Sequence, residues 1–588
     1  MNQDREKIDG IRHSLAHLLA DTVKQMFPGS LNAIGPVIEN GFYQDFEIKG
    51  KLKEEDLPKI EEAMRAKLNA WKGFSKKEVG LEEAKQVFGD NKYKIELAEE
   101  FAAGGKTLTI YTIGGFDDLC KGGHADDLSL IDPNSFKLTS TAGAYWRGDE
   151  KNIMLTRIYG VAFETKDELE AYLKQQELAK ERDHRKLGRE LDLFTFSELV
   201  GSGLPLYTPR GTLIRDSLVG LSEKLRSNIG FVKVWSPHIT KKDLYEVSGH
   251  WSKFGDELFL VESQETSDKL VMKPMNCPHH SQIYVSRPRT YKELPLKLME
   301  TTTNYRDEKT GELHGLSRVR SLSQDDSHTY CTEDQVEEVF HQLIGAIKLF
   351  YGSIDMKLGL RISLRDDSDA YLGDKKLWEF GQDKLRKIAK ENSLDYYEEE
   401  GEAAFYGPKL DFMAEDAIGR KWQVATIQFD FVQPERFKLK YIDRGGKEKQ
   451  PIMVHCAIMG SFDRFFGVFI EHTNGHFPFW LAPEQIRIVT VNDSVNDYVA
   501  KVKDILSGVV LMKPLKYNEL RFEEDARKEN LGKKIRVAEE MKIPLILIVG
   551  PKDMEAETVS LRFRADDETV EEKIKLSELA EWITKFNG

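Results

Sequence analysis

A long charged segment separates two parts of the chain whose hydrophobic patterns differ. From Thr165 to about Arg189 the segment contains no proline, and its first glycine is Gly188. Leu169 and Leu173 fall on one face at helical spacing, which predicts a single long connecting helix. A chain of 588 residues can form three or four domains, each with its own hydrophobic core. We therefore expect the connector to hold an N-terminal domain apart from the domains that follow.

Three hydrophobic patterns lie on the two sides of this connector. Residues 1–164 mix helices with short strands, as in an α/β domain. Residues 191–482 contain short strands between turns and few regular βαβ units, which predicts an antiparallel sheet flanked by helices. Residues 483–588 alternate apolar strands with amphipathic helices, including a helix at 526–541, which predicts a small α/β domain. The expected fold is an α+β multidomain protein with a linker helix at 165–190.

Charge and cysteine content exclude several classes of protein. The net charge of −14 excludes a chain that is basic throughout, so nucleic-acid binding would need local positive patches. Four cysteines are too few for a disulfide scaffold, and they indicate a reducing compartment, which predicts a cytoplasmic location. The polar start, MNQDREKIDG, is unlike a signal peptide, and no apolar run approaches the ~20 residues of a membrane helix. We therefore expect no membrane partner.

Four side chains suited to metal binding occur in the N-terminal domain. His13 and His17 share one face of a predicted helix, and Cys120 and His124 flank a pair of glycines. Such a set is compatible with zinc. The same imidazoles can also position and activate water without a metal, with Asp118 orienting one ring. Alternatively, the two histidines and the cysteine are buried structural residues, and the pattern alone does not decide among the three interpretations.

The central region contains three segments whose order is informative. Pro237 follows a predicted strand at 231–235, Arg306 and Glu308 precede a loop, and Arg464 opens an apolar helix. In this order the segments resemble the three signature motifs of class II aminoacyl-tRNA synthetases. The resemblance implies that Arg306 holds the α-phosphate of ATP, Glu308 the adenine amino group and Arg464 the γ-phosphate. Arginine suits this chemistry because its guanidinium meets phosphate oxygens in charge-assisted forks. By the same resemblance Arg318 is a further nucleotide contact, and Mg²⁺ accompanies ATP.

Further segments at 275–278, 324–328 and 454–460 are similar to the threonyl-tRNA synthetase family, and this resemblance extends over essentially the whole chain. It implies one Zn²⁺ per chain, bound by Cys277, His328 and His455. Threonine and valine are nearly isosteric, so a hydrophobic pocket separates them poorly. An open zinc can accept the amino and hydroxyl groups of threonine. The implied substrates are ATP, L-threonine and tRNA(Thr), and the family is homodimeric through the element around Pro237.

The same resemblance assigns the rest of the central site. Asp326 would accept a hydrogen bond from the threonine hydroxyl, and His250 would assist transfer of threonine to the tRNA. His279 and His280 are expected to be exposed or to lie behind the zinc ligands. The remaining threonine contacts would be Met275, Tyr406, Gln428 and Ala457. The remaining ATP contacts would be Gln423 and Ser461.

Serine poses a problem that zinc does not solve, because it lacks only one methyl group of threonine. One methyl group changes the binding free energy by only ~1–3 kcal/mol, and this discrimination is too small for faithful translation. A second, hydrolytic site is therefore expected, and the resemblance implies that the N-terminal cluster hydrolyses seryl-tRNA(Thr). Water activation without a metal is favoured there. The residues implied are His13, His17, Lys94, Asp118, Cys120 and His124.

Two features depart from the family pattern. His13 follows the start of the sequence almost at once, so we expect the ubiquitin-like domain of most bacterial members to be absent. The C-terminal region resembles an anticodon-binding domain but is slightly acidic, with an acidic run at 566–568. Arg527 and Lys534 would form either a basic stripe toward RNA or a solvated helix face.

Two other functions compete with this hypothesis. A non-catalytic synthetase homologue that binds RNA should have lost Arg306, Arg464 or the zinc ligands, and this chain retains them all. A metallohydrolase based on the N-terminal cluster would leave the central motifs unexplained.

Overall fold

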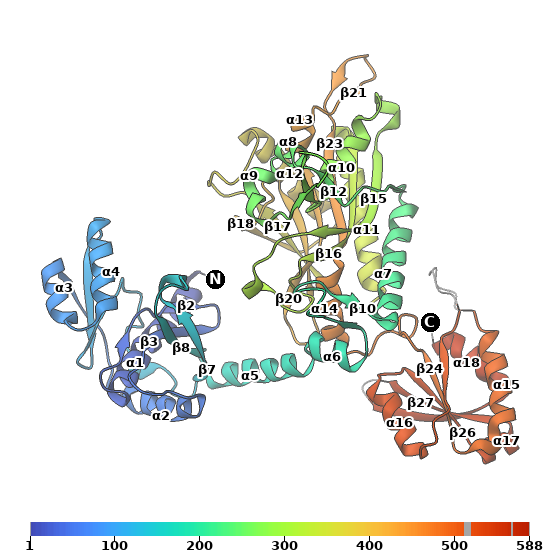
Figure 1. Cartoon of the computed structure of the whole chain (residues 1–588), viewed down its shortest axis with the longest axis horizontal. Coiled ribbons are helices and arrows are strands. Elements are labelled where there is room, and N and C mark those ends of the chain that lie inside the picture. Colours follow the sequence, from blue (N-terminus) through green and yellow to red (C-terminus); the bar gives the residue numbers. More distant parts are fainter. Residues whose placement is uncertain (1, 511–518, 566–567, 587–588) are drawn as a thin grey trace. The chain divides into compact units, whose positions relative to one another are not determined.

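The computed structural model describes residues 2–510, 519–565 and 568–586, and it forms two compact units, Met1–Leu178 and Ala179–Gly588 (Figure 1). Among the described residues, no helix combines the length and the apolar character needed to cross a bilayer.

The N-terminal unit is built around helix α1 (Asn2–Met26) and a five-stranded sheet. The predicted helical face is confirmed, since Leu15, Leu18 and Leu19 are fully buried. Helix α2 (Leu57–Leu68) packs against α1 and the sheet. The sheet strands are β1 (Leu31–Asn32), β2 (Val37–Ile38), β3 (Gly41–Glu47), β7 (Phe136–Tyr145) and β8 (Met154–Ala162). A separate three-stranded sheet with two helices comprises β4 (Ser75–Val79), β5 (Leu108–Ile113), β6 (Phe116–Leu119), α3 (Leu81–Phe88) and α4 (Lys92–Ala103).

The connector is two helices, so the prediction of one continuous helix is wrong. Helix α5 spans Lys166–Glu181, and α6 spans His184–Glu190. The break occurs at Asp183, whose carboxylate accepts the backbone N–H of Arg185 at 2.7 Å. Aspartate competes with helical hydrogen bonding in this way and favours the start of a new helix.

An eight-stranded sheet forms the middle of the second unit, in the order β11-β15-β16-β23-β20-β19-β17-β18. Only its two edge pairs, β11 with β15 and β17 with β18, are parallel, so the predicted antiparallel sheet is confirmed. The strand expected at 231–235 is reduced to β11. The strands are β11 (Val232–Lys233), β15 (Leu296–Tyr305), β16 (Ser321–Cys331), β17 (Lys357–Leu364), β18 (Tyr396–Glu400), β19 (Lys409–Glu415), β20 (Lys421–Asp430) and β23 (Ile452–Ser461).

Helices cover this sheet and complete its core. Helices α7 and α11 pack against each other and against central strands of the sheet (Figure 1). Their apolar faces and the buried strands form one continuous core. The helices that frame the site are α7 (Pro209–Asn228), α8 (Asp243–Ser248), α9 (His250–Phe254), α10 (Cys277–Val285), α11 (Val336–Gly352), α12 (Lys375–Glu391) and α14 (Phe462–Thr473).

The last part of the second unit is a mixed five-stranded sheet with helices, as predicted. Helix α16 (Leu531–Glu540) begins later than expected, because Asn530 accepts the backbone N–H of Lys533 and caps it. Val510 forms an isolated antiparallel bridge with Glu519. The other elements are β24 (Ile486–Thr490), β25 (Phe522–Asp525), β26 (Leu545–Val549), β27 (Thr558–Ala565), β28 (Glu568–Lys575), α15 (Asn496–Ser507), α17 (Pro551–Ala556) and α18 (Leu579–Phe586).

Candidate functional site

Strand register brings the three predicted zinc ligands together. His328 of β16 lies directly opposite His455 of β23, and Cys277 is the first residue of α10. All three side chains are buried, and one ligand atom from each lies within 4.8 Å of the others. One thiol and two imidazoles at this spacing fit a tetrahedral zinc site with an open position.

A second layer of polar groups orients the two histidines. His455 Nε2 lies 2.8 Å from Asp430 Oδ2, and His328 Nδ1 lies 2.7 Å from His280 Nδ1. His280 in turn places Nε2 3.4 Å from Glu300 Oε2. Such partners are typical of metal-binding histidines, whose ring orientation they fix. Burial also lowers the pKa of His328 well below its ordinary value, so the ring stays neutral, as a metal ligand must.

His280 therefore lies behind a ligand, as one of the two expectations allowed. His279 is 7 % exposed, so the expectation that it might be exposed is wrong.

Two neighbouring carboxylates of β16 point to opposite faces of the strand, as the alternation of a β-strand requires. The pairing with β23 shifts between Gln324 and Asp326. Asp325 accepts the backbone N–H groups of Ile458 and Met459, at 3.2 and 3.0 Å. Asp326 instead faces the zinc-ligand cluster, and burial together with the charge of Asp325 raises its pKa to about 8. The shift is a bulge in β23, where residues 458–460 lie opposite Asp325 alone, so the Asp325 carboxylate takes the N–H groups that leave the ladder there.

A cavity of about 160 Å³ unites the predicted threonine contacts with the zinc ligands and Arg306. The Tyr406 hydroxyl donates to Gln428 Oε1, and its ring stacks on His455 at 4.9 Å. Two polar lining residues, Gln324 and Thr426, were not predicted. Both could have been found, because they lie two residues from Asp326 and Gln428 on the same strands. The predicted residues in the lining are Met275, Cys277, Arg306, Asp326, His328, Tyr406, Gln428, His455 and Ala457.

Arg306 is the predicted nucleotide contact that lines the cavity of the threonine contacts. Burial lowers the pKa of its guanidinium, which lines two adjoining cavities. Glu308 and Arg318 pair with each other at 2.8 Å. Ser461 caps α14, and the Arg464 guanidinium lies 6.0 Å from the centre of the Trp422 ring.

The structure does not place Gln423 in the cavity lining. Its amide is held between Asp411 and Arg361, at 2.9 Å from each. Asp411 is fully buried and also accepts a hydrogen bond from Thr426 at 2.8 Å. Gln423 therefore supports the cavity wall through Thr426 in this structure.

His250 lies in the small cavity beside Arg306. The cavity of about 80 Å³ is lined by both residues and by Met275. His250 Nδ1 lies 2.8 Å from Ser248 Oγ, and Nε2 lies 4.0 Å from Cys277 Sγ. Burial lowers the pKa of His250 to about 3, so the imidazole is neutral near neutral pH.

The N-terminal cluster is equally compact. His13 Nε2 lies 3.2 Å from both His17 Nε2 and Cys120 Sγ, and Cys120 Sγ lies 3.4 Å from His124 Nε2. Gly10 makes this possible, because a side chain there would lie 3.2 Å from the backbone of His124. The four groups can hold a metal ion or position water.

A buried ion pair supports this cluster from behind. Asp118 Oδ1 lies 2.5 Å from Lys94 Nζ, and Oδ2 lies 3.0 Å from His17 Nδ1. Burial opposes a charged ring, but the hydrogen bonds to Asp118 and Cys120 prevail and raise the pKa of His17 to about 9. Burial likewise opposes a thiolate, and the three histidines lower the pKa of Cys120 to about 3. Phe74, which was not predicted, stacks on His124 at 3.8 Å.

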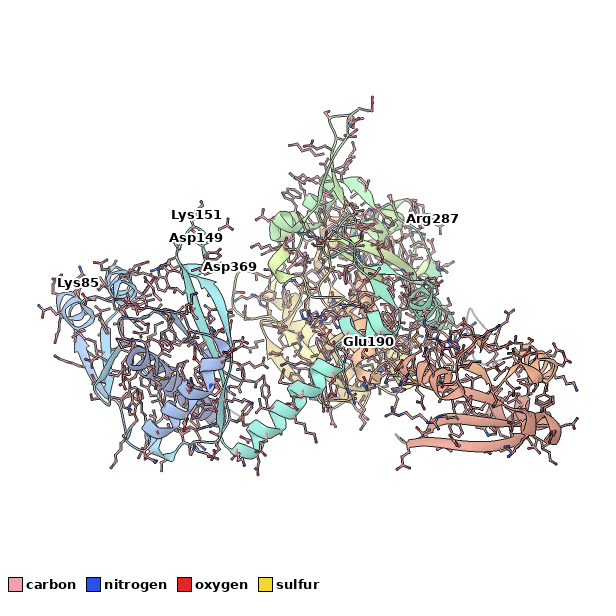
Figure 2. All side chains as sticks on the ribbon, turned by 60° about the horizontal axis from the view of Figure 1, so that its bottom comes forward. Lys85, Asp149, Lys151, Glu190, Arg287 and Asp369 are labelled. Carbon is pink, nitrogen blue, oxygen red and sulfur yellow. The ribbon has the colours of Figure 1, made fainter. Side chains whose placement is uncertain are left out.

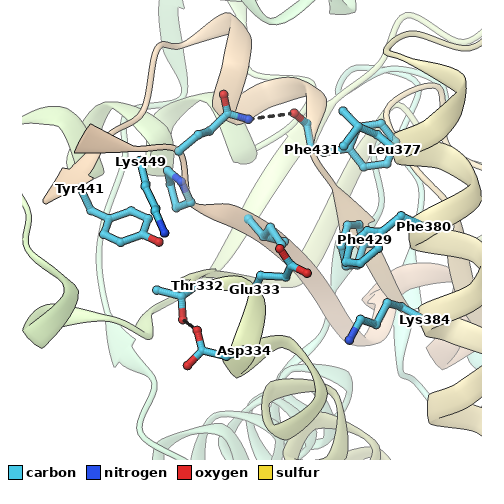
Figure 3. A pocket seen from close by; sticks show the side chains of 13 residues that line it. Thr332, Glu333, Asp334, Leu377, Phe380, Lys384, Phe429, Phe431, Tyr441 and Lys449 are labelled. Carbon is cyan, nitrogen blue, oxygen red and sulfur yellow. Dashed lines mark hydrogen bonds between the residues drawn. The ribbon is translucent and has the colours of Figure 1, made fainter. Parts of the chain in front are cut away.

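A further cavity, of about 690 Å³, lies in the central domain beside α12 (Figure 3). Phe380, Phe429 and Phe431 line it together with Lys384 and Lys449. It contains none of the predicted site residues, so it takes no part in the assignments below.

Neither alternative for Arg527 and Lys534, a basic stripe or a solvated helix face, matches the structure of the C-terminal domain. Arg527 precedes α16 and is paired with Asp525, and Lys534 is buried with Nζ 3.2 Å from Thr490 Oγ1. Elsewhere on the chain, charged side chains of both signs are exposed, among them Asp149, Lys151 and Arg287 (Figure 2). Residues 566 and 567 of the acidic run lie outside the described residues.

Comparisons with known proteins identify the domain families and the relatives of this chain. Models of three domain families match: a tRNA synthetase class II core domain (G, H, P, S and T) at residues 259–473, an anticodon binding domain at 485–586, and the threonyl and alanyl tRNA synthetase second additional domain at 108–159. A threonine–tRNA ligase of Gloeobacter violaceus is 45 % identical over 575 residues, covering 96 % of this chain and 90 % of the relative. One of Thermotoga maritima is 42 % identical over 570 residues, covering 96 % of this chain and 86 % of the relative.

A solved structure gives the same result at lower coverage. It is described as the RNA binding domain of threonyl-tRNA synthetase from Cryptosporidium parvum. It has a TM-score of 0.62 and 31 % identity, and the match covers 69 % of this chain and 97 % of that one.

Proposed function

The chain belongs to the threonyl-tRNA synthetase family, and we propose on this premise how its residues divide two reactions between two sites. It is a threonine–tRNA ligase with a class II core, an anticodon-binding domain and an editing domain. The central cavity activates threonine and transfers it to tRNA(Thr). The N-terminal cluster hydrolyses seryl-tRNA(Thr). The observation that carries this division is that Arg306 shares its cavity with Cys277, His328 and His455.

Adenylation places new negative charge on the α-phosphate of ATP, which requires a fixed cation. Arg306 is the group that meets this phosphate, because its guanidinium enters the cavity beside the threonine contacts. Arg464 takes the γ-phosphate at the start of α14, and Glu308 with Arg318 takes the adenine side. Mg²⁺ enters with ATP and bridges phosphate oxygens.

One Zn²⁺ per chain would be held by Cys277, His328 and His455. When bound, it supplies a Lewis acid for the amino and hydroxyl groups of threonine. Asp326 faces the same space and accepts the hydrogen bond of the threonine hydroxyl. Valine has the amino group but no hydroxyl, so it can make neither the hydroxyl contact to zinc nor the one to Asp326, and this difference excludes valine. After adenylation, neutral His250 assists removal of the proton from the ribose hydroxyl of the tRNA.

Serine keeps both polar groups, so the N-terminal cluster must remove it after transfer. His13, His17 and His124 converge on Cys120, while Asp118 and Lys94 hold His17 in place. These groups position a water molecule and the ester of seryl-tRNA(Thr) for hydrolysis. Water activation without a metal remains the favoured route.

The assembly is a homodimer through the β11 edge of the central sheet. Val232 and Trp235 support this, because they are 54 % and 75 % exposed beside the edge strand. Large apolar side chains at a sheet edge favour pairing with a second chain. The proposed location is the cytoplasm, since all four cysteines of the chain are free thiols in the structure.

Threonine-dependent exchange between ATP and pyrophosphate tests the assignment of the central site, with zinc content measured on the same sample. We expect exchange with one zinc per chain, and Arg306→Ala should reduce exchange at least ~100-fold. A folded, zinc-loaded chain without exchange would overturn the assignment. Two zinc ions per chain would show that the N-terminal cluster also binds metal.

A further inference from the structure

A buried histidine connects the start of the second linker helix to the loop at 306–320. His184 is the first residue of α6 and is 1 % exposed. Glycines on both sides make room for its ring. A Cβ atom at Gly315, in the loop, would lie 2.3 Å from His184 Nε2, and one at Gly467, in α14, would lie 3.4 Å from a ring carbon. The loop and the helix are therefore shaped to admit this side chain.

The partners of the two ring nitrogens fix the tautomer of His184. The backbone N–H of Leu316 lies 3.0 Å from Nε2 and can only donate, so Nε2 accepts. The ring proton therefore lies on Nδ1, which donates to Glu471 Oε1 at 2.6 Å. The same carboxylate oxygen accepts the backbone N–H of His184 at 3.1 Å. One neutral imidazole thus bridges the loop and α14.

Glu471 extends this contact toward the second phosphate-binding element. Its other carboxylate oxygen pairs with Arg420, whose Nε lies 2.7 Å from Asp416. Trp422 donates to the same Asp416 oxygen at 3.0 Å. The guanidinium of Arg464 lies 6.0 Å from the centre of the Trp422 ring. The network thus approaches the proposed ATP contacts from two sides.

The beginning of α6 is also fixed to α14 by a second contact. Arg182 Nη1 donates to the backbone carbonyl of His472 at 3.3 Å. Asp183 caps α6 directly before His184. The position of the ring is therefore set by the linker as well as by the catalytic domain.

We propose that His184 is a positioning residue that holds the loop at 306–320 in its ATP-binding conformation and ties that conformation to the linker. The proposal rests on the roles proposed for Glu308 and Arg318. Leu316 lies between these two residues in the sequence, so its hydrogen bond to His184 restrains the backbone that sets their spacing. A movement of the linker at 182–190 moves the ring and therefore acts on the loop.

Two substitutions at one position test the proposal. In His184→Asn the amide nitrogen replaces Nδ1, which keeps a donor for Glu471 but leaves the N–H of Leu316 without an acceptor. We expect the KM for ATP in threonine-dependent pyrophosphate exchange to rise about tenfold, and the KM for threonine to stay within about twofold. In His184→Gln the amide reaches the position of Nε2 and should restore most of the loss. His341→Asn is the matched control. His341 lies on α11, with Nδ1 3.0 Å from Asn392 Oδ1, and the substitution there should change neither KM.

Each outcome has a defined meaning. An unchanged KM for ATP in His184→Asn, or an equal rise in both KM values, would overturn the proposal. Equal losses in the Asn and Gln variants would contradict the role of the Leu316 hydrogen bond. If His184→Asn does not fold, Gly315→Ala gives a second measurement, because its Cβ would displace the ring, and it should also raise the KM for ATP alone. Arg318→Ala distinguishes failure of the proposed ATP-binding role of the loop from failure of the positioning role of His184. An unchanged KM for ATP in Arg318→Ala contradicts the role of the loop. A raised KM for ATP in Arg318→Ala but not in the His184 variants refutes the role of His184.

Discussion

Removing the lysine behind the editing cluster should loosen the N-terminal unit without affecting adenylation. Lys94 and Asp118 form an ion pair at 2.5 Å, with side chains 5 % and 4 % exposed. Lys94→Met keeps the length of the side chain but removes one of the two cations that pair with the carboxylate, the other being His17. Removing one partner of a buried pair costs about 3–5 kcal/mol, because a charge remains buried. We expect about 3 kcal/mol, the lower end, since His17 and the backbone N–H of Leu119 still donate to Asp118.

Hydrogen exchange of the full chain measures this change locally. A loss of about 3 kcal/mol should accelerate amide exchange in β5 and β6 roughly 100-fold. Lys92→Met is the matched control, because Lys92 pairs with Glu47 at 2.7 Å but is 57 % exposed, and such a pair contributes about 0–1 kcal/mol. Threonine-dependent pyrophosphate exchange should stay at the parent rate in both variants.

Two results would refute this reasoning. One is equal protection of β5 and β6 in the Lys94 and Lys92 variants. The other concerns the double variant, Lys94→Met with Asp118→Asn. The reasoning fails if its loss of protection in β5 and β6 equals the sum of the losses, in free energy, of the two single variants. The double variant removes both charges of the Lys94–Asp118 pair, so it should recover part of the lost protection.

Two further predictions concern zinc retention and acid stability. His280→Ala removes the hydrogen-bond partner of His328, so zinc affinity should fall about 10–100-fold in competition with a chelator, and unchanged affinity would contradict the support role. The hydrogen bonds and charge of Arg185 outweigh burial and lower the pKa of Asp183 to about 2. The stabilisation from the Asp183 carboxylate is therefore complete above the unfolded pKa of ~3.9 and is lost as pH falls toward 2. The thermal midpoint of Asp183→Asn should consequently drop less between pH 5 and pH 2.5 than that of the parent. An equal drop in the two proteins would contradict this prediction.

The order of the domains and the antiparallel character of the central sheet could be predicted, because apolar runs and turn residues mark them locally. The break in the linker could not, since it depends on Asp183 capping a new helix rather than continuing the old one. The hairpin of β27 and β28 was also missed. Polar residues fill most of β28, so its pattern resembles a surface segment more than a strand.

Among the site residues, those close in the sequence could be predicted to lie together, whereas those brought together by strand pairing could not. Spacing could suggest His13 with His17, because four residues make one helical turn. No spacing rule could pair His328 with His455, since the register of β16 on β23 brings them together. The family resemblance supplied those residues instead. The basic stripe failed for a physical reason, because Lys534 is buried and hydrogen-bonded rather than directed to solvent.

The separation of two active sites on one chain is tested most directly with His13→Ala. Deacylation of seryl-tRNA(Thr) and threonine-dependent pyrophosphate exchange are measured on the same full-length preparation. We predict that deacylation falls at least ~100-fold, because His13 contacts both His17 and Cys120 in the hydrolytic cluster, while exchange continues at the parent rate. Loss of both activities, or deacylation at the parent rate, would contradict the proposed division.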